Sequence, residues 1–131
     1  MESSRASILG GRVLSGLAIA FLAMDGVMKF VPDVPAVAEA SAQLGWPMST
    51  NPAIGAALLI SVALYALPAT AVLGAILLTG YLGGAVAMHV RVGNPLVTHT
   101  LFPISVGLIV WGGLFLRDAR VRALIPFRSA A

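Results

Sequence analysis

The chain has 131 residues, of which 59% are hydrophobic and 10% are charged, and its mean hydropathy is +0.97. Charged residues make up about a quarter of an ordinary soluble domain, so the composition excludes that class and predicts an integral membrane protein. The length allows one membrane domain, residues 1–131. The chain has no cysteine, which excludes thiol nucleophiles, disulfides and cysteine-ligated iron–sulfur or zinc sites within it.

Four apolar segments predict membrane-spanning helices, because a span needs about 20 mostly apolar residues. In chain order they are residues 8–30, 52–67, 69–89 and 96–116. Pro32 and Pro35 end the first segment, since proline cannot continue a helix. We expect Asn51 or Ser49 to cap the start of the second segment. The predicted fold is therefore all-α, an integral membrane four-helix bundle.

The link between the first two spans predicts a short helix at the membrane surface. Residues 36–44 are good helix formers, and Gly45 is suited to end such a helix. The segment sets polar side chains against apolar ones, namely Glu39, Ser41 and Gln43 against Trp46 and Met48. This pattern is typical of an amphipathic interfacial helix.

Small residues recur along the first, third and fourth spans. In a membrane they let helix backbones approach closely. Their number predicts a compact bundle, and we expect helix contacts at Gly11, Ser15, Gly16, Gly80, Gly83, Gly84, Ala85, Ala87, Gly107, Gly112 and Gly113.

The basic residues predict the orientation of the chain, because cytoplasmic segments of membrane proteins are enriched in lysine and arginine. Arg5 and Arg12 precede or begin the first span, and four arginines lie in the tail, residues 117–131. We expect a multi-pass protein of the plasma membrane (the bacterial inner membrane) with both termini cytoplasmic. The lipid bilayer is its expected partner, and the basic tail is expected to lie at anionic headgroups. The tail has no nucleic-acid motif, so no nucleic-acid partner is expected.

Asp25 and Lys29 are the most informative residues, because ionisable side chains inside a span are costly and are usually buried, paired or functional. They are four positions apart, so they share one helix face and can reach each other. The pair is either a structural contact that fixes helix packing or part of a site that binds a substrate or accepts a proton.

The predicted topology brings further polar residues to the same, outer end of the bundle. His89 ends the third span, and Tyr81 lies about 80° round that helix from it. The catalytic candidates are Asp25 and His89, and the ligand-binding candidates are Lys29, Tyr81, Arg91, Asn94 and His99. Asp25, His89 and His99 would supply three metal ligands, but their spacing matches no metal motif, so no metal site is predicted.

Four segments are similar to a known family: AMDGVMKF at 23–30, AEASAQLGWP at 38–47, LPATAVLGAILLTGYLGGAVAMHVRVGNP at 67–95 and LFPISVGLIVWGGLFLRDARVRALIPFR at 101–128. With these segments the chain resembles the DoxX-like family of small four-span membrane proteins. The family takes its name from a subunit associated with thiosulfate:quinone oxidoreductase activity. The resemblance therefore implies a four-helix bundle, a membrane redox role, a quinone as cofactor and a redox protein as partner.

Three interpretations stay open from the sequence, which does not decide whether the chain is an enzyme. The first is an accessory or quinone-interacting subunit of a membrane redox complex, with Lys29, Arg91 and His89 as hydrogen-bond donors. The second is a small-molecule-binding membrane enzyme with Asp25 as general base and His89 as its proton partner. The third is a structural or assembly protein in which the polar residues only set helix register. The resemblance favours the first.

Overall fold

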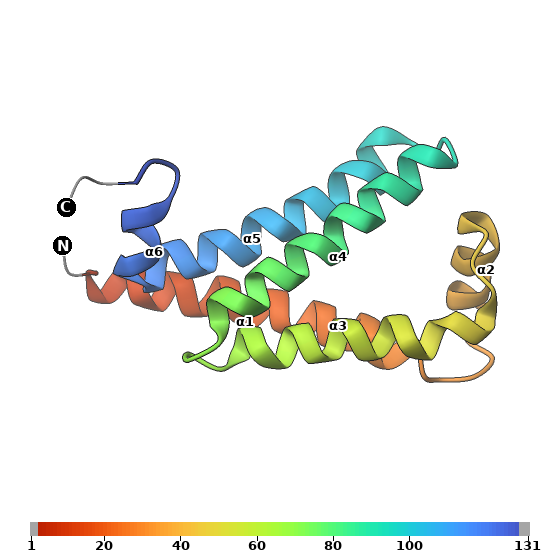
Figure 1. The fold of residues 1–131 in the computed structure, drawn as a ribbon, viewed down its shortest axis with the longest axis horizontal. Helices are drawn as coiled ribbons and strands as arrows, with labels where there is room; N and C mark the ends of the chain where they lie inside the picture. The colour runs from red at the N-terminus through yellow and green to blue at the C-terminus, as the bar shows by residue number, and fades with distance from the viewer. Residues whose placement is uncertain (1–2, 129–131) are drawn as a thin grey trace.

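The computed structural model describes residues 3–128, and every regular element within that range is helical. In this part of the chain, four segments are long and apolar enough to cross a membrane: Arg5–Met28, Met48–Ala66, Ala71–Arg91 and Leu96–Arg117. The predicted all-α membrane bundle is confirmed. Figure 1 shows that the described chain begins and finishes at one end of this bundle.

The bundle consists of α1 (Arg5–Met28), α3 (Asn51–Ala66), α4 (Ala71–Arg91) and α5 (Leu101–Arg117). Shorter elements connect or follow these helices: α2 (Pro35–Leu44), the 3₁₀ turn η1 (Met48–Thr50), the π-helical turn η2 (Leu96–Thr100) and α6 (Ala119–Leu124). The helix α6 lies in the basic tail, where the sequence indicated none. Asp118 starts it by accepting a hydrogen bond of 2.9 Å from the backbone N–H of Arg120.

Small residues bring α1 against α5, as expected. A Cβ added at Gly11 would lie 2.7 Å from the carbonyl oxygen of Gly113, and one added at Gly113 would overlap the hydroxyl of Ser15. With no side chain between them, the two backbones are in direct contact. The predicted contacts at these three positions are confirmed.

Tyr65 joins three helices at the centre of the bundle and is fully buried. Its hydroxyl donates to the carbonyl of Val110 on α5 (2.7 Å) and shares a hydrogen bond with the hydroxyl of Ser15 on α1 (2.9 Å). Gly74 of α4 lies so close to the backbone of Tyr65 that an added Cβ would overlap it. This contact holds α3 and α4 together beside their short connection, and the two helices diverge from there (Figure 1).

The prediction of glycine contacts was wrong for Gly16 on α1, which has open space where a Cβ would be, and for the middle of α4. Gly80, Gly83 and Gly84 have open space where a Cβ would be. The reason is which face of the helix is buried: α4 packs through Gly74, Ala75, Leu78 and Leu82, at spacings of one, three and four. The three glycines lie off that face and are exposed.

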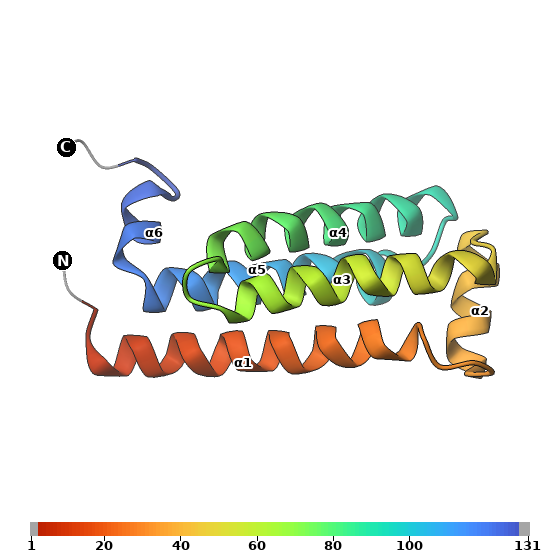
Figure 2. The ribbon, with the colours of Figure 1, turned by 60° about the horizontal axis from the view of Figure 1, so that its bottom comes forward.

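The helix α2, which the sequence predicted to lie at the membrane surface, stands across the end of the bundle opposite the start of α1 and the end of α5 (Figure 2). It ends at Gly45, whose φ of 75° is left-handed, which confirms the predicted stop. The predicted capping of α3 by Asn51 or Ser49 was wrong. Thr50 is the N-cap, and its hydroxyl donates to the carbonyl of Pro47 at 2.7 Å instead of capping the helix. Asn51 is already the first residue of α3, and its buried side chain bonds to Ser41 of α2.

Candidate functional site

Asp25, Lys29 and Tyr81 form one polar cluster where α1 faces α4. The Lys29 ammonium lies 3.1 Å from Oδ1 of Asp25, and the Tyr81 hydroxyl donates to Oδ2 at 3.4 Å. The Lys29 side chain is 17% exposed and that of Asp25 is 39% exposed. Both carboxylate oxygens are thus engaged, and both donors come from partly buried positions. We call these three residues the polar cluster.

The polar cluster lies on the wall of a cavity of about 300 Å³. Most of the other lining residues are apolar, and they come from α1, from α2 and its flanking segments, and from the start of α3: Met24, Met28, Val34, Ala36, Val37, Ala40, Leu44, Trp46 and Ile54. Because α2 and its flanking segments supply so much of the lining, we call this the surface-helix cavity. Its composition is that of a ligand site, with apolar walls and a few polar groups.

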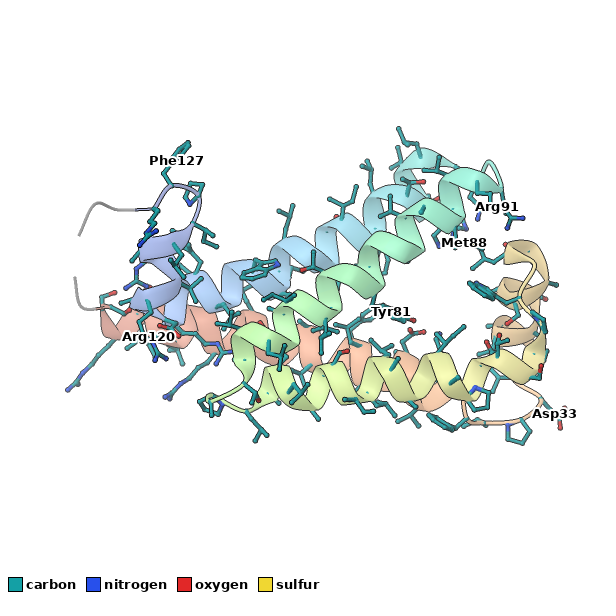
Figure 3. The ribbon with its side chains drawn as sticks, viewed as in Figure 1. Asp33, Tyr81, Met88, Arg91, Arg120 and Phe127 are labelled. Carbon is teal, nitrogen blue, oxygen red and sulfur yellow. The ribbon has the colours of Figure 1, made fainter. Side chains whose placement is uncertain are left out.

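Two glycines allow the close helix contact that positions Asp25. Gly26 follows Asp25, and a Cβ added there would lie 2.7 Å from the Leu59 side chain on α3. A Cβ added at Gly55 would lie 2.9 Å from the carbonyl oxygen of Gly26. The close crossing of α1 and α3 therefore fixes where Asp25 sits. Tyr81 comes from α4, and Figure 3 labels its side chain in the space between α4 and the other long helices.

A buried amide–hydroxyl pair closes the wall beneath α2. The amide of Asn51 donates to the hydroxyl of Ser41 at 3.0 Å, and that hydroxyl lies 3.4 Å from Oδ1 of Asn51. Both side chains are buried and both line the surface-helix cavity. This pair ties α2 to α3. In the sequence, Ser41 is one polar position of the predicted surface helix and Asn51 a predicted cap, and no local pattern pairs residues ten positions apart.

The remaining candidates gather around the turn between α4 and η2. The side-chain amide of Asn94 shares a hydrogen bond of 2.8 Å with Nδ1 of His89, and the hydroxyl of Thr98 shares one of 2.8 Å with Nδ1 of His99. The two imidazole rings meet edge to face, 5.4 Å between centroids. Arg91 is exposed at the end of α4, where Figure 3 labels it far along the helix from Tyr81.

The structure thus divides the predicted outer polar layer into two groups. Asp25, Lys29 and Tyr81 line the surface-helix cavity, whereas His89, Arg91, Asn94 and His99 do not. Within residues 3–128, no three His, Asp or Glu side chains are grouped closely enough to hold a metal ion. Asp25 is therefore separated from the two histidines with which it would have formed a metal site.

The model of the DoxX-like family matches residues 13–113. No curated protein matches the chain, and no solved structure matches it. The matched range covers most of the chain, including the polar cluster and both histidines, and this bears out the resemblance seen in the sequence. It stops before Arg117 and α6 and starts after Arg12.

Proposed function

This chain belongs to the DoxX-like family, and we propose that it binds the headgroup of a quinone, or of a similar amphipathic molecule, as an accessory subunit of a membrane redox complex. The observation behind the proposal is the polar cluster on the wall of an otherwise apolar cavity beneath α2. A quinone has the matching chemistry: a flat apolar ring and two carbonyl oxygens that accept hydrogen bonds.

The cluster supplies hydrogen-bond donors of the kind that such a molecule needs. The Lys29 ammonium has three N–H groups, and Asp25 accepts one of them, so two remain for a quinone carbonyl. The single O–H of Tyr81 is donated to Asp25 and holds the carboxylate in place. The cavity volume of about 300 Å³ is at the lower end of the range of about 300–1,000 Å³ that is usual for ligand sites. It therefore suits a ring-sized headgroup.

The chain has no cysteine, so thiol redox chemistry would take place on a partner protein. In this proposal the chain holds the quinone, and the partner delivers the electrons. The alternative role of Asp25 as general base has less support, because both of its oxygens already have partners and His89 lies outside the cavity lining.

The two tryptophans allow a direct test of binding. Trp46 lines the surface-helix cavity, whereas Trp111 lies on the α4–α5 side and donates to Thr79 at 2.8 Å. A short-chain quinone added to the detergent-solubilised Trp111→Phe variant should quench the fluorescence of Trp46. The matched Trp46→Phe variant, which retains Trp111, should show much weaker quenching.

Substitutions in the cluster then test whether the quenching reports this site. Tyr81→Phe removes the hydrogen bond that holds Asp25, and through it Lys29, in place, and should weaken binding by up to about 1 kcal/mol. Lys29→Met should weaken it more, because a charged donor is lost. Equal quenching of both tryptophans would mean that the quinone only partitions into the micelle, and it would refute the proposal.

A further inference from the structure

A second cavity lies at the opposite end of the bundle, beside the start of α1 and the end of α5. Its volume is about 570 Å³, and α1, the α3–α4 connection, α5 and α6 all contribute to its lining. Three arginines line it, Arg12, Arg117 and Arg120, together with one acidic residue, Asp118. We call it the arginine cavity. Figure 3 labels Arg120 at this end of the molecule, far from α2.

The positive charge of the arginine cavity is only partly neutralised. Asp118 pairs with Arg120, since both of its oxygens lie 3.2 Å from the guanidinium. Within residues 3–128, neither Arg12 nor Arg117 has a carboxylate within 4.0 Å. With three arginines and one aspartate in its lining, the arginine cavity has a net charge of two positive charges.

The guanidinium of Arg117 packs against an aromatic ring, and one of its hydrogen-bond donors has no acceptor in the part of the chain that the structure describes. Its guanidinium lies 5.5 Å from the centre of the Tyr65 ring, a cation–π distance. Its Nε atom is buried and has no hydrogen-bond partner among the described residues. Buried donors are normally satisfied, so the guanidinium of Arg117, a residue that lines the cavity, is not saturated by acceptors of the described residues.

The start of α4 adds to the positive electrostatic potential of the arginine cavity. Ala71, its first residue, lines the arginine cavity, as does Pro68. The N-cap Thr70 does not cap the helix, because its hydroxyl donates to the carbonyl of Leu64 at 2.7 Å. The first N–H groups of this 21-residue helix therefore have no side-chain cap, and such helix starts favour anions.

We infer that the arginine cavity binds the phosphate group of an anionic ligand, and that this ligand is a phospholipid headgroup at the ends of the spanning helices. Basic pockets between membrane helices are suited to anionic lipid headgroups. Two lining residues, Ile8 and Leu114, are apolar and lie within spans, which places the phosphate beside hydrocarbon. The three arginines lie outside the range matched by the family model, so the inference concerns this chain in particular.

The test is native mass spectrometry of the full chain in detergent, titrated with phosphatidylglycerol and, separately, with phosphatidylcholine. Phosphatidylglycerol should bind more tightly. Each of Arg12→Gln and Arg117→Gln should weaken its binding about fivefold. Arg5→Gln and Arg128→Gln make the same charge change outside the cavity lining and serve as matched controls.

A competition with inorganic phosphate distinguishes the two sources of the phosphate group. If millimolar phosphate displaces phosphatidylglycerol from the unmodified chain but not from Arg12→Gln, the site also accepts a free phosphate. If it does not displace the lipid, the headgroup is the ligand.

The inference is overturned if all four arginine variants lose phosphatidylglycerol equally, or if none does, because the attraction would then be diffuse or absent. Equal binding of the two lipids overturns it as well. Arg12 is exposed, so Arg12→Gln keeps the experiment decisive even if Arg117→Gln fails to fold. None of these results depends on quinone binding at the other end of the bundle.

Discussion

The hydroxyl of Tyr81 on α4 donates a 3.4 Å hydrogen bond to Oδ2 of Asp25 on α1, while Lys29 lies at the other carboxylate oxygen. The contact joins two helices on either side of a cavity rather than within a packed core. The ion pair therefore extends beyond one helix, and it is this extension toward the cavity that supports the proposed binding role.

The ion pair makes a prediction about stability. Lys29→Met leaves the Asp25 carboxylate without its charged partner and should lower the free energy of unfolding by about 1–3 kcal/mol. The double variant Asp25→Asn/Lys29→Met should recover most of that loss, because no charge is then left unpaired. Unfolding in mixed micelles measures both. Equal losses in the single and double variants would show that the lysine acts through packing and not through charge.

Asn51 controls the position of α2 in our account of the cavity. Asn51→Leu removes the bonds to Ser41 and leaves that buried hydroxyl unsatisfied, at a cost of about 1–3 kcal/mol. We expect faster amide hydrogen exchange in α2 and weaker quenching of Trp46 by quinone. Ser49→Ala, at an exposed neighbouring position, is the control. If exchange in α2 is unchanged in Asn51→Leu, the surface helix is held by other contacts.

Hydropathy was sufficient to predict the four spans, because the bilayer demands long apolar helices whatever their packing. The contact between Asp25 and Lys29 was also predictable, since a spacing of four on a helix is a local relation. Tyr81 was expected to border the same region because it lies about 80° round the helix from His89, yet the structure brings Tyr81 to Asp25 and leaves His89 outside the cavity lining.

The division of the polar layer could not be predicted, because it depends on how α4 packs. Because α4 diverges from α3 (Figure 1), the last turn of α4, which carries His89, does not contribute to the surface-helix cavity. The turn η2 then brings His99 to His89. Pro103 lacks the N–H that would bond to the carbonyl of His99, and the chain before it forms a π-helical turn. The bond between Ser41 and Asn51 is likewise tertiary.

Gly74 and Gly83, on the same helix, provide a matched pair of substitutions. Gly74→Ala places a methyl group against the backbone of Tyr65, which cannot shift as a flexible side chain could. The substitution should lower the free energy of unfolding by about 1–3 kcal/mol through overpacking. Gly83→Ala meets open space and should not destabilise the isolated chain; the higher helix propensity of alanine should instead stabilise it by about 0.5–1 kcal/mol. Thermal melting in detergent measures both. A large loss at Gly83 would reveal a contact there with another copy of the chain or another protein.

Asp118 predicts a pH dependence confined to the tail. The hydrogen bond from the Arg120 side chain lowers the pKa of Asp118 below its ordinary value of 3.8, although partial burial opposes the shift. A lowered pKa means that the carboxylate stabilises α6 at every pH above the unfolded value, and that this contribution is lost as the pH falls through the lower folded value. Hydrogen exchange of the α6 amides, corrected for intrinsic rates, should therefore stay constant from about pH 7 to pH 5 and rise towards about pH 3.

Substitutions of Asp118 separate its role as a helix cap from its charge. At neutral pH, Asp118→Ala should loosen α6 by about 1 kcal/mol through loss of the cap, whereas Asp118→Asn retains a capping oxygen and should loosen it less. Identical exchange in the two variants would assign the effect to charge alone and contradict the capping role.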